Sequence, residues 1–232
     1  MPAKTTMTRR ARLEARETAI IEAARAIFAE AGFDGARMAD IAKAAGVSEG
    51  TLYLYFENKM ALMQAVITGY YEALTEAGED GLKKLTDTRD RLGFLARLHV
   101  TRMMGNWQIL MQASFVFRDH AGYGASTQYA LNKAYVGLFD RIIAEARGRG
   151  EMDEATPLWV LRDLFFGGLE YAMRTARVRG QLDDPGGIAD ALLPAFLSAC
   201  GLNTPRAEPA ADRLAGLVDR LEAAIDQVTH KR

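Results

Sequence analysis

The stretch that decides the fold is residues 36–70, which read ARMADIAKAAGVSEGTLYLYFENKMALMQAVITGY. Met38 and Ile41 stand at helical spacing, so one side of a first helix can pack inward. Gly46 predicts the end of that helix, because glycine enters the left-handed conformation without steric cost. Ser48 then offers a side-chain oxygen to the free amides of a second, short helix. Two helices joined by a short turn with glycine form a helix-turn-helix, whose second helix lies in the major groove of DNA.

The pattern continues on both sides of this turn. Its residues are Ile41, Ala42, Ala45, Gly46, Val47, Ser48, Gly50, Thr51, Leu52, Tyr53, Tyr55, Phe56, Lys59 and Leu62, preceded by Ile20, Ala23, Ala24, Ile27, Phe28, Ala31, Gly32 and Phe33. In these positions the chain resembles the tetracycline-repressor (TetR) family over residues 13–70, and beyond them only in length and helical layout. The resemblance implies an all-helical, dimeric, ligand-responsive regulator, usually a repressor, that binds a double-stranded DNA operator.

The resemblance also implies which residues approach DNA. They are Arg37, Met38, Ser48, Glu49, Gly50, Thr51, Tyr53, Leu54, Tyr55 and Lys59. The hydroxyls of Thr51 and Tyr55 suit phosphate oxygens, and Lys59 adds its charge to the amides at the start of the next helix. Tyr53 and Tyr55 stand two positions apart on one helix, so they cannot both face the same point. We therefore expect that one of them can serve to cover the core.

Four positions depart from the family pattern. Ala36 and Arg37 stand where Ser or Thr often caps the helix and touches phosphate. The charge of Arg37 can replace the phosphate contact, but its side chain cannot cap. Leu54 replaces a polar or aromatic residue. Glu49 either accepts a hydrogen bond from a cytosine amine or favours the helix N-terminus by its charge. These departures leave the motif intact.

Composition predicts an ordinary soluble globular protein. The chain has 232 residues, 49% of them hydrophobic and 25% charged, which is typical of such domains. No apolar run approaches the roughly 20 residues of a membrane span, and the basic N-terminus has no hydrophobic segment after it, so we expect no secretory signal and a cytoplasmic location. The single cysteine, Cys200, predicts a small buried hydrophobe.

Charge is unevenly distributed, although the net charge is only −1. Glu14 is the single acid among the first sixteen residues, against the cations Lys4, Arg9, Arg10, Arg12 and Arg16. Such an arm either lies along DNA phosphates or enters the minor groove, or it is a solubilising disordered tail. Both interpretations stay open on the sequence.

Glycine and proline divide a chain without the alternating pattern of strands, so we predict an all-α fold. Helices are expected near 10–31, 38–45, 49–55, 58–79, 88–104, 106–118, 125–149, 156–179, 186–200 and 210–229. The expected breaks between them fall at glycine and proline positions, among them Gly78–Gly81. The expected domains are a basic arm and helix-turn-helix head at 1–57, a ligand-binding and dimerisation domain at 58–202, and a linker with an added helix at 203–232.

The added C-terminal helix carries a heptad seam. Its apolar positions, spaced four and three apart, are Leu214, Val218, Leu221, Ile225 and Val228. It is too short for an independent coiled coil. We expect it to dock on the body of the protein or on a partner subunit.

The larger part of the chain is rich in methionine and aromatic residues, which suit adaptable apolar cavities. The predicted ligand-binding residues are Met103, Met104, Trp107, Met111, Phe115, Arg118, Tyr129, Phe166, Glu170 and Arg174. The alternative is that such side chains, at helical spacing, are ordinary core. The arrangement FGGLE after a long helix is similar to that of fatty-acyl-CoA-responsive members of the family, and an aromatic or drug-like effector stays equally open.

Dimerisation is expected from the helices near 156–179 and 186–200. By the resemblance, these helices form a four-helix interface with their copies in the partner. The predicted interface residues are Phe165, Gly168, Ala172, Leu192 and Phe196. A two-fold dimer would match a palindromic operator, and a ligand that moves the helix near 58–79 would change the spacing of the two heads.

The sequence does not predict an enzyme. It has no dinucleotide-binding glycine pattern, no phosphate-binding loop and no H-E-x-x-H motif. His99, His120 and His230 are scattered, so we expect no metal site and no cofactor. The remaining rival is a helical protein-interaction module without specific DNA binding. The basic arm and the set Thr51, Tyr55 and Lys59 favour DNA.

Overall fold

The computed structural model describes residues 8–116, 127–152, 154–181 and 184–202. All regular elements in these ranges are helices, so the all-α prediction is confirmed. In chain order they are α1 (Arg9–Gly35), α2 (Met38–Ala44), α3 (Glu49–Tyr55), α4 (Lys59–Leu82), α5 (Thr88–Gly105), α6 (Trp107–Val116), α7 (Thr127–Gly148), α8 (Leu158–Val178) and α9 (Pro185–Ala199).

The predicted helix-turn-helix is formed by α2 and α3. Gly46 adopts a φ of 67°, the left-handed conformation that ends α2. The amide of Val47 donates to the Ala42 carbonyl at 3.0 Å, and the amide of Gly46 donates to the Lys43 carbonyl at 3.2 Å. This pair of bonds is the Schellman arrangement that satisfies the last carbonyls of a helix. Ser48 begins α3 as its N-cap, as predicted.

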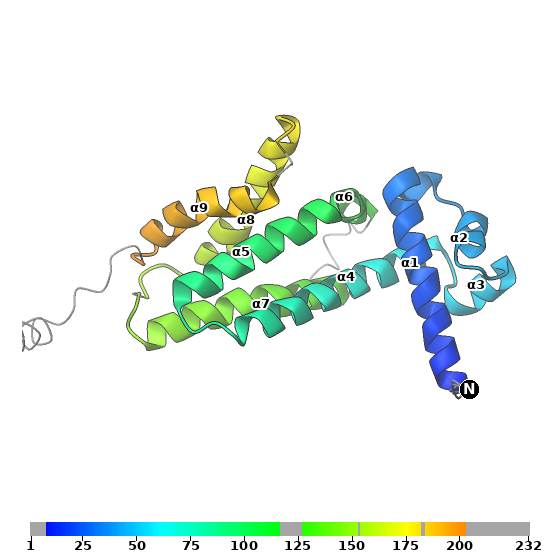
Figure 1. Cartoon of the computed structure of the whole chain (residues 1–232), viewed down its shortest axis with the longest axis horizontal. Helices are drawn as coiled ribbons and strands as arrows, with labels where there is room; N and C mark the ends of the chain where they lie inside the picture. Colours follow the sequence, from blue (N-terminus) through cyan, green and yellow to red (C-terminus); the bar gives the residue numbers. More distant parts are fainter. Residues whose placement is uncertain (1–7, 117–126, 153, 182–183, 203–232) are drawn as a thin grey trace, which may run out of the picture.

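A first apolar core holds the head, which comprises α1, α2 and α3. Phe28, Ile41 and Leu52 have no exposed surface, so each of the three helices contributes a fully buried anchor. The start of α4 and the middle of α6 complete this core, through residues such as Leu62 and Ile109. Figure 1 shows α1 crossing the N-terminal end of α4, with α2 and α3 on the side of α1 that faces away from the body.

α4 runs from the head into the body without interruption, and this corrects one prediction. The break expected at Gly78–Gly81 is wrong, because α4 continues to Leu82. A Cβ at Gly81 would lie 1.9 Å from the Phe94 ring, and one at Gly78 would lie 2.4 Å from Leu138 Cδ1. Glycine stands here to let α5 and α7 approach closely, not to end the helix.

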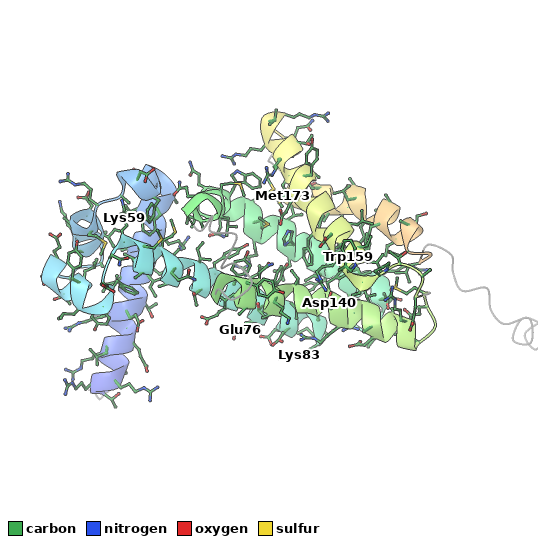
Figure 2. All side chains as sticks on the ribbon, turned by 180° about the vertical axis from the view of Figure 1, so that it is seen from behind. Lys59, Glu76, Lys83, Asp140, Trp159 and Met173 are labelled. Atoms are coloured by element: carbon green, nitrogen blue, oxygen red, sulfur yellow. The ribbon has the colours of Figure 1, made fainter. Side chains whose placement is uncertain are left out.

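A second apolar core holds the body. In it α4 packs against α7, and α5 packs against α9 and α8 (Figure 1). Its centre is aromatic, since the Phe139 ring lies 4.9 Å from that of Phe165 and 5.9 Å from that of Phe166. His99 and Thr88 on α5 are buried polar side chains of the body, with 5% and 2% of their surface exposed. Figure 2 shows Lys59 in the head and Lys83 at the far end of α4, within the body.

The other predicted helices agree with the observed ones to within a few residues. α1 extends to Gly35 across a kink at Gly32, where φ is 78°. Cys200 is buried, as predicted. The helix predicted over 210–229 lies outside the described residues. Among the helices that are described, none is long and apolar enough to cross a membrane.

Candidate DNA interface and ligand cavity

The outer face of α3 is exposed and is not covered by other parts of the described structure. Leu54 is 86% exposed and Tyr53 is 47% exposed, although both are large and apolar. A Cβ at Gly50 would meet no other atom within 4 Å, so the backbone there is open to a ligand. Of the other predicted DNA residues, Arg37, Ser48 and Glu49 are also exposed, while Met38, Thr51, Tyr55 and Lys59 are partly buried.

Ser48 and Thr51 are joined to each other at the start of α3. The Ser48 hydroxyl accepts the Thr51 amide at 3.1 Å, and the two hydroxyls lie 2.8 Å apart. The first bond is the N-cap, which fixes the beginning of the helix. The second holds the Thr51 hydroxyl at the helix N-terminus, where amides favour an anion such as a phosphate.

The two tyrosines of α3 have different environments. Tyr53 faces outward, whereas Tyr55 packs against the head core. The Tyr55 hydroxyl is buried and has no hydrogen-bond partner among the described residues. Tyr55 is therefore the tyrosine that covers the core, and its hydroxyl is buried instead of exposed for the predicted phosphate contact.

Lys59 contacts the protein itself instead of standing free at the start of α4. Its Nζ donates to the carbonyls of Asp34 at 3.2 Å and Ala36 at 3.0 Å. The same ammonium lies 4.8 Å from the centre of the Phe33 ring. Lys59 thus joins the end of α1 to the start of α4, and the expected phosphate contact of its ammonium would require these bonds to open. Arg37 begins α2 without a side-chain cap, as predicted.

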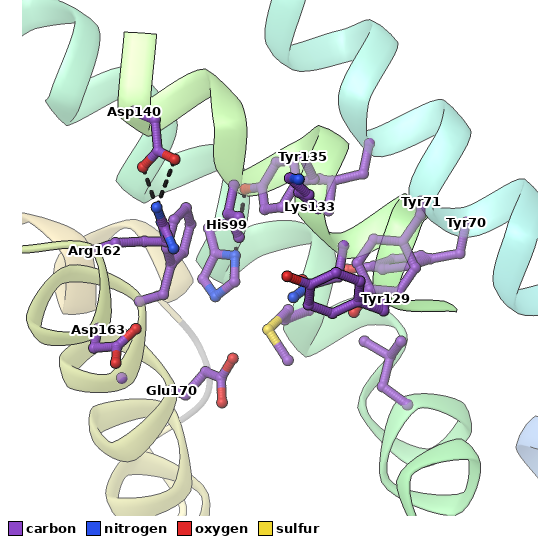
Figure 3. Close-up of a pocket in the computed structure, with 17 residues that line it drawn as sticks. Tyr70, Tyr71, His99, Tyr129, Lys133, Tyr135, Asp140, Arg162, Asp163 and Glu170 are labelled. Atoms are coloured by element: carbon purple, nitrogen blue, oxygen red, sulfur yellow. Dashed lines mark hydrogen bonds and ion pairs between the residues drawn. The ribbon is translucent and has the colours of Figure 1, made fainter. Parts of the chain in front are cut away.

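The body contains a cavity of 420 Å³ bounded by α4, α5, α6, α7 and α8 (Figure 3). This volume lies within the range typical of small-molecule sites. Its lining residues are Tyr70, Tyr71, Leu74, His99, Met103, Leu110, Tyr129, Asn132, Lys133, Tyr135, Val136, Asp140, Arg162, Asp163, Phe166, Gly167 and Glu170.

The structure brings four of the predicted ligand residues to this cavity, namely Met103, Tyr129, Phe166 and Glu170. Four other described residues, Met104, Trp107, Met111 and Arg174, do not line it. Arg174 instead lies over the Trp107 ring, 6.0 Å from its centre. Which side chains of a helix reach the cavity is a property that residue type does not reveal. Arg118 and the side chain of Phe115 lie outside the described residues.

The contribution of α4 to the cavity wall and the burial of His99 were not predicted from the sequence. Tyr70, Tyr71 and Leu74 were not predicted, because α4 was treated only as a connection between head and body. His99 was treated only as a scattered histidine. The signal was present, since His99 stands four residues before Met103 and three after Ala96 on one apolar stripe of α5, and polar residues at core positions are uncommon.

An ion pair closes one side of the cavity. Arg162 Nε and Nη2 donate to the two carboxylate oxygens of Asp140 at 2.8 and 2.6 Å. This bidentate geometry is the strong form of an arginine–carboxylate contact. The pair neutralises both charges where α7 meets α8, as Figure 3 shows.

Burial shifts the pKa of four side chains at the cavity, His99, Tyr70, Tyr135 and Glu170. It lowers the pKa of His99 to about 3, so the imidazole is neutral at physiological pH. It raises the pKa of Tyr70 well above its ordinary value. Burial also raises the pKa of Glu170, and the neighbouring Arg174 acts in the opposite direction. Desolvation of this kind disfavours the charged form of each group.

The predicted dimer residues all lie on α8 and α9. Phe165, Gly168, Leu192 and Phe196 line a groove of 190 Å³ between the two helices, and Ala172 lines a neighbouring one. Phe165 is only 4% exposed and supports Phe196 from beneath, with the ring centres 5.1 Å apart. Phe165 is therefore mainly core. Among the described residues, no three His, Cys, Asp or Glu side chains are grouped to hold a metal ion.

Comparisons with known proteins agree with this geometry. Residues 20–66 match the model of "Bacterial regulatory proteins, tetR family". The chain is 25% identical to the Fatty acid metabolism regulator protein of Bacillus subtilis over 179 residues, which cover 77% of this chain and 92% of that protein. It is 52% identical to the HTH-type transcriptional regulator UidR of Escherichia coli over 50 residues, which cover 22% of this chain and 26% of that protein.

The fold is similar to that of a solved regulator. The transcriptional regulator FadR from Bacillus subtilis, crystallised in complex with stearoyl-CoA, aligns with a TM-score of 0.68. The alignment covers 78% of this chain and 97% of that chain at 24% sequence identity.

A helix-turn-helix head on a helical body with a pocket is the arrangement of the ligand-responsive DNA-binding transcriptional regulators. The predicted resemblance to the TetR family is confirmed. The family model matches the head at residues 20–66, and a regulator of similar length matches over most of the chain.

Proposed function

We propose that this chain is a homodimeric repressor that leaves its operator when an amphipathic small molecule enters the cavity. The observation that carries the proposal is α4. This helix holds the head core through Leu62 and Ile67 and walls the cavity through Tyr70 and Leu74. A ligand that fits one position of this wall better than another therefore shifts the position of the head. A coupling of about 1–3 kcal/mol is enough for a usable response.

The proposed division of labour follows the chain. Residues 1–57 bind DNA, residues 58–202 bind the effector and form the dimer, and residues 203–232 are an addition to this plan. On DNA, the exposed surface of α3 at Gly50 and Tyr53 would read the major groove. The Thr51 hydroxyl and the first amides of α4 would hold phosphates.

The proposed dimer interface is the outer face of α8 and α9. Leu164 is 57% exposed and Tyr171 is 73% exposed beside the groove at Gly168. A Cβ at Gly168 would meet no other atom within 4 Å, so this surface has room for a second copy of the chain. A contiguous apolar face of this kind marks an interaction site. A two-fold dimer would hold two α3 helices about 34–36 Å apart, the distance between successive major grooves.

The effector that we propose carries a long acyl chain. This is supported by the similarity to a fatty acid metabolism regulator and to a regulator that was crystallised with stearoyl-CoA. It is also supported by the apolar side chains along the cavity, which include Leu74, Met103, Leu110, Val136 and Phe166. An aromatic, drug-like effector is the second class that the cavity would admit.

Fluorescence anisotropy tests the regulator function directly. The full chain is titrated with the DNA that flanks its own gene and with a scrambled duplex, over a salt series. We expect binding to the flanking DNA at least a hundredfold tighter, with two protomers on each operator or a multiple of two, and weaker binding when an acyl-CoA is added. Equal, steeply salt-dependent binding to both duplexes would indicate non-specific charge contacts alone and would contradict the proposal.

A further inference from the structure

Two buried polar atoms face the cavity without a partner. They are Nε2 of His99 and the hydroxyl oxygen of Tyr70, and neither has a hydrogen-bond partner among the residues that the structure describes. Leaving a buried donor or acceptor unsatisfied costs about 1–3 kcal/mol. Two such atoms on one cavity are therefore expected to be satisfied by what the cavity binds.

The hydrogen bond at His99 Nδ1 determines whether Nε2 is a donor or an acceptor. The Tyr135 hydroxyl lies 3.3 Å from His99 Nδ1. A neutral imidazole carries one proton, and the phenol is the more acidic of these two groups, so Tyr135 donates to Nδ1 and the imidazole proton stands on Nε2. Nε2 is then a hydrogen-bond donor, as is the hydroxyl of Tyr70. The lining of the cavity thus offers two hydrogen-bond donors, one from α5 and one from α4.

The charges around the cavity disfavour an anionic acceptor. Arg162 is held by Asp140 in a bidentate pair, so its charge is already balanced. Asp163 and Glu170 add acidic groups to the lining, against the exposed Lys133. In Figure 3, Tyr135 and Glu170 lie on opposite sides of His99. A carboxylate placed against Nε2 would therefore meet Glu170 in a partly desolvated site, where like charges repel strongly.

We propose that His99 and Tyr70 donate to uncharged acceptor atoms of the effector, such as those of an acyl ester or thioester group, and that the cavity discriminates against the free fatty acid. The acyl chain lies along the apolar part of the lining. This inference rests on the proposed function, because it names the chemistry of the effector at the same cavity.

Calorimetric titration of the full chain at pH 7.5 tests the inference. The probes are methyl dodecanoate, dodecanoate and dodecanoyl-CoA, a chain length chosen for solubility. We expect the ester to bind at least tenfold more tightly than the carboxylate. Tyr70→Phe removes only the unpartnered hydroxyl, so we expect it to weaken ester binding about fivefold and to leave thermal stability unchanged or higher.

Tyr55→Phe is the matched control, because it also removes a buried tyrosine hydroxyl without a partner, but in the head. We expect it to leave the affinity for the ester within twofold of the wild type. His99→Phe is the second variant; it should weaken ester binding further and reduce the preference for ester over carboxylate.

Three results would overturn the inference: a carboxylate that binds as tightly as the ester, an ester affinity that Tyr70→Phe leaves unchanged, or no binding of any of the three probes. The proposed function is judged separately, on DNA. If the carboxylate releases the operator, the regulator stands and only the recognition of an uncharged acceptor group is wrong. If the chain binds no operator at all, the proposed function fails whatever the probes do.

Discussion

The head and the body of this protein place their functional groups on opposite sides of a core. In the head, the core is apolar and complete, with Phe28, Ile41 and Leu52 fully buried, and the candidate DNA contacts project outward from it. In the body, the core is interrupted by a cavity, and the candidate contacts, His99 and Tyr70, point inward. A surface that reads DNA needs a rigid support, whereas a sensor needs an interior that a ligand can complete.

The largest expected effect breaks the head core alone. Leu52→Ala removes a side chain with no exposed surface, and we expect a loss of about 2–5 kcal/mol in the free energy of unfolding. Leu54→Ala changes the same residue type in the same helix, but at a position that is 86% exposed, and we expect a change within about 0.5 kcal/mol. Denaturant unfolding measures both. Equal losses would show that α3 does not pack as described.

A smaller effect tests the close packing of α4 in the body. Gly81→Ala places a Cβ where the Phe94 ring now lies, and we expect a cost of about 1–3 kcal/mol from overpacking. Gly69→Ala is the control in the same helix, since a Cβ there meets nothing within 4 Å. It should stabilise the protein by up to about 1 kcal/mol, because alanine favours a helix over glycine. Thermal unfolding measures the stability of both variants against the wild type. A Gly81→Ala variant that is more stable than the wild type would contradict the described contact.

The pH dependence of stability tests a second difference between the two cores, because the body core contains a buried histidine, His99, and the head core is apolar. The pKa of His99 is lowered from its ordinary 6.5 to about 3. Between these values the unfolded state binds a proton that the folded state does not, so stability is complete above pH 6.5 and falls with acidification by about 1.4 kcal/mol per pH unit.

His99→Gln should remove this contribution to the slope. Denaturant unfolding at pH 7, 6 and 5, at one fixed protein concentration, compares the two chains by slope and not by absolute stability. Parallel slopes would mean that His99 accepts its proton in the folded state as readily as in the unfolded one.

The smallest expected effect concerns the cap of α3. Ser48→Ala removes the oxygen that accepts the Thr51 amide, and we expect a loss of about 1 kcal/mol. Ser48→Gly should cost only a few tenths of a kcal/mol, because glycine is tolerated at an N-cap. Chemical denaturation measures the pair, and a Ser48→Gly variant that is weaker than Ser48→Ala would argue against the capping role.

Much of the head could be predicted because its structure follows from short-range chemistry. Gly46 and Ser48 lie beside the backbone groups that they satisfy, so spacing alone indicated both the turn and the cap. Lys59 could not be placed in this way, since its partners, the carbonyls of Asp34 and Ala36, are more than twenty positions away in the chain.

The cavity was predicted only in part, for a related reason. Residue type indicated Met103 and Phe166, which line the cavity, but it also indicated Trp107, which does not. Tyr70 and His99 reach the same cavity because α4, α5 and α7 pack against one another. Which face of a helix turns inward depends on the tertiary packing of its neighbours, and a single amphipathic pattern does not specify it.

The continuity of α4 has a consequence for the insertion of residues. One residue added between Ile67 and Tyr70 would turn the head by about 100° against the body and move it about 1.5 Å along the helix axis. Seven added residues would nearly restore the angle, yet leave the head about 10 Å farther away. Heads exchanged between related regulators must therefore be joined in phase. The number of residues in α4 between the head and the body therefore sets the orientation of the DNA-reading helix.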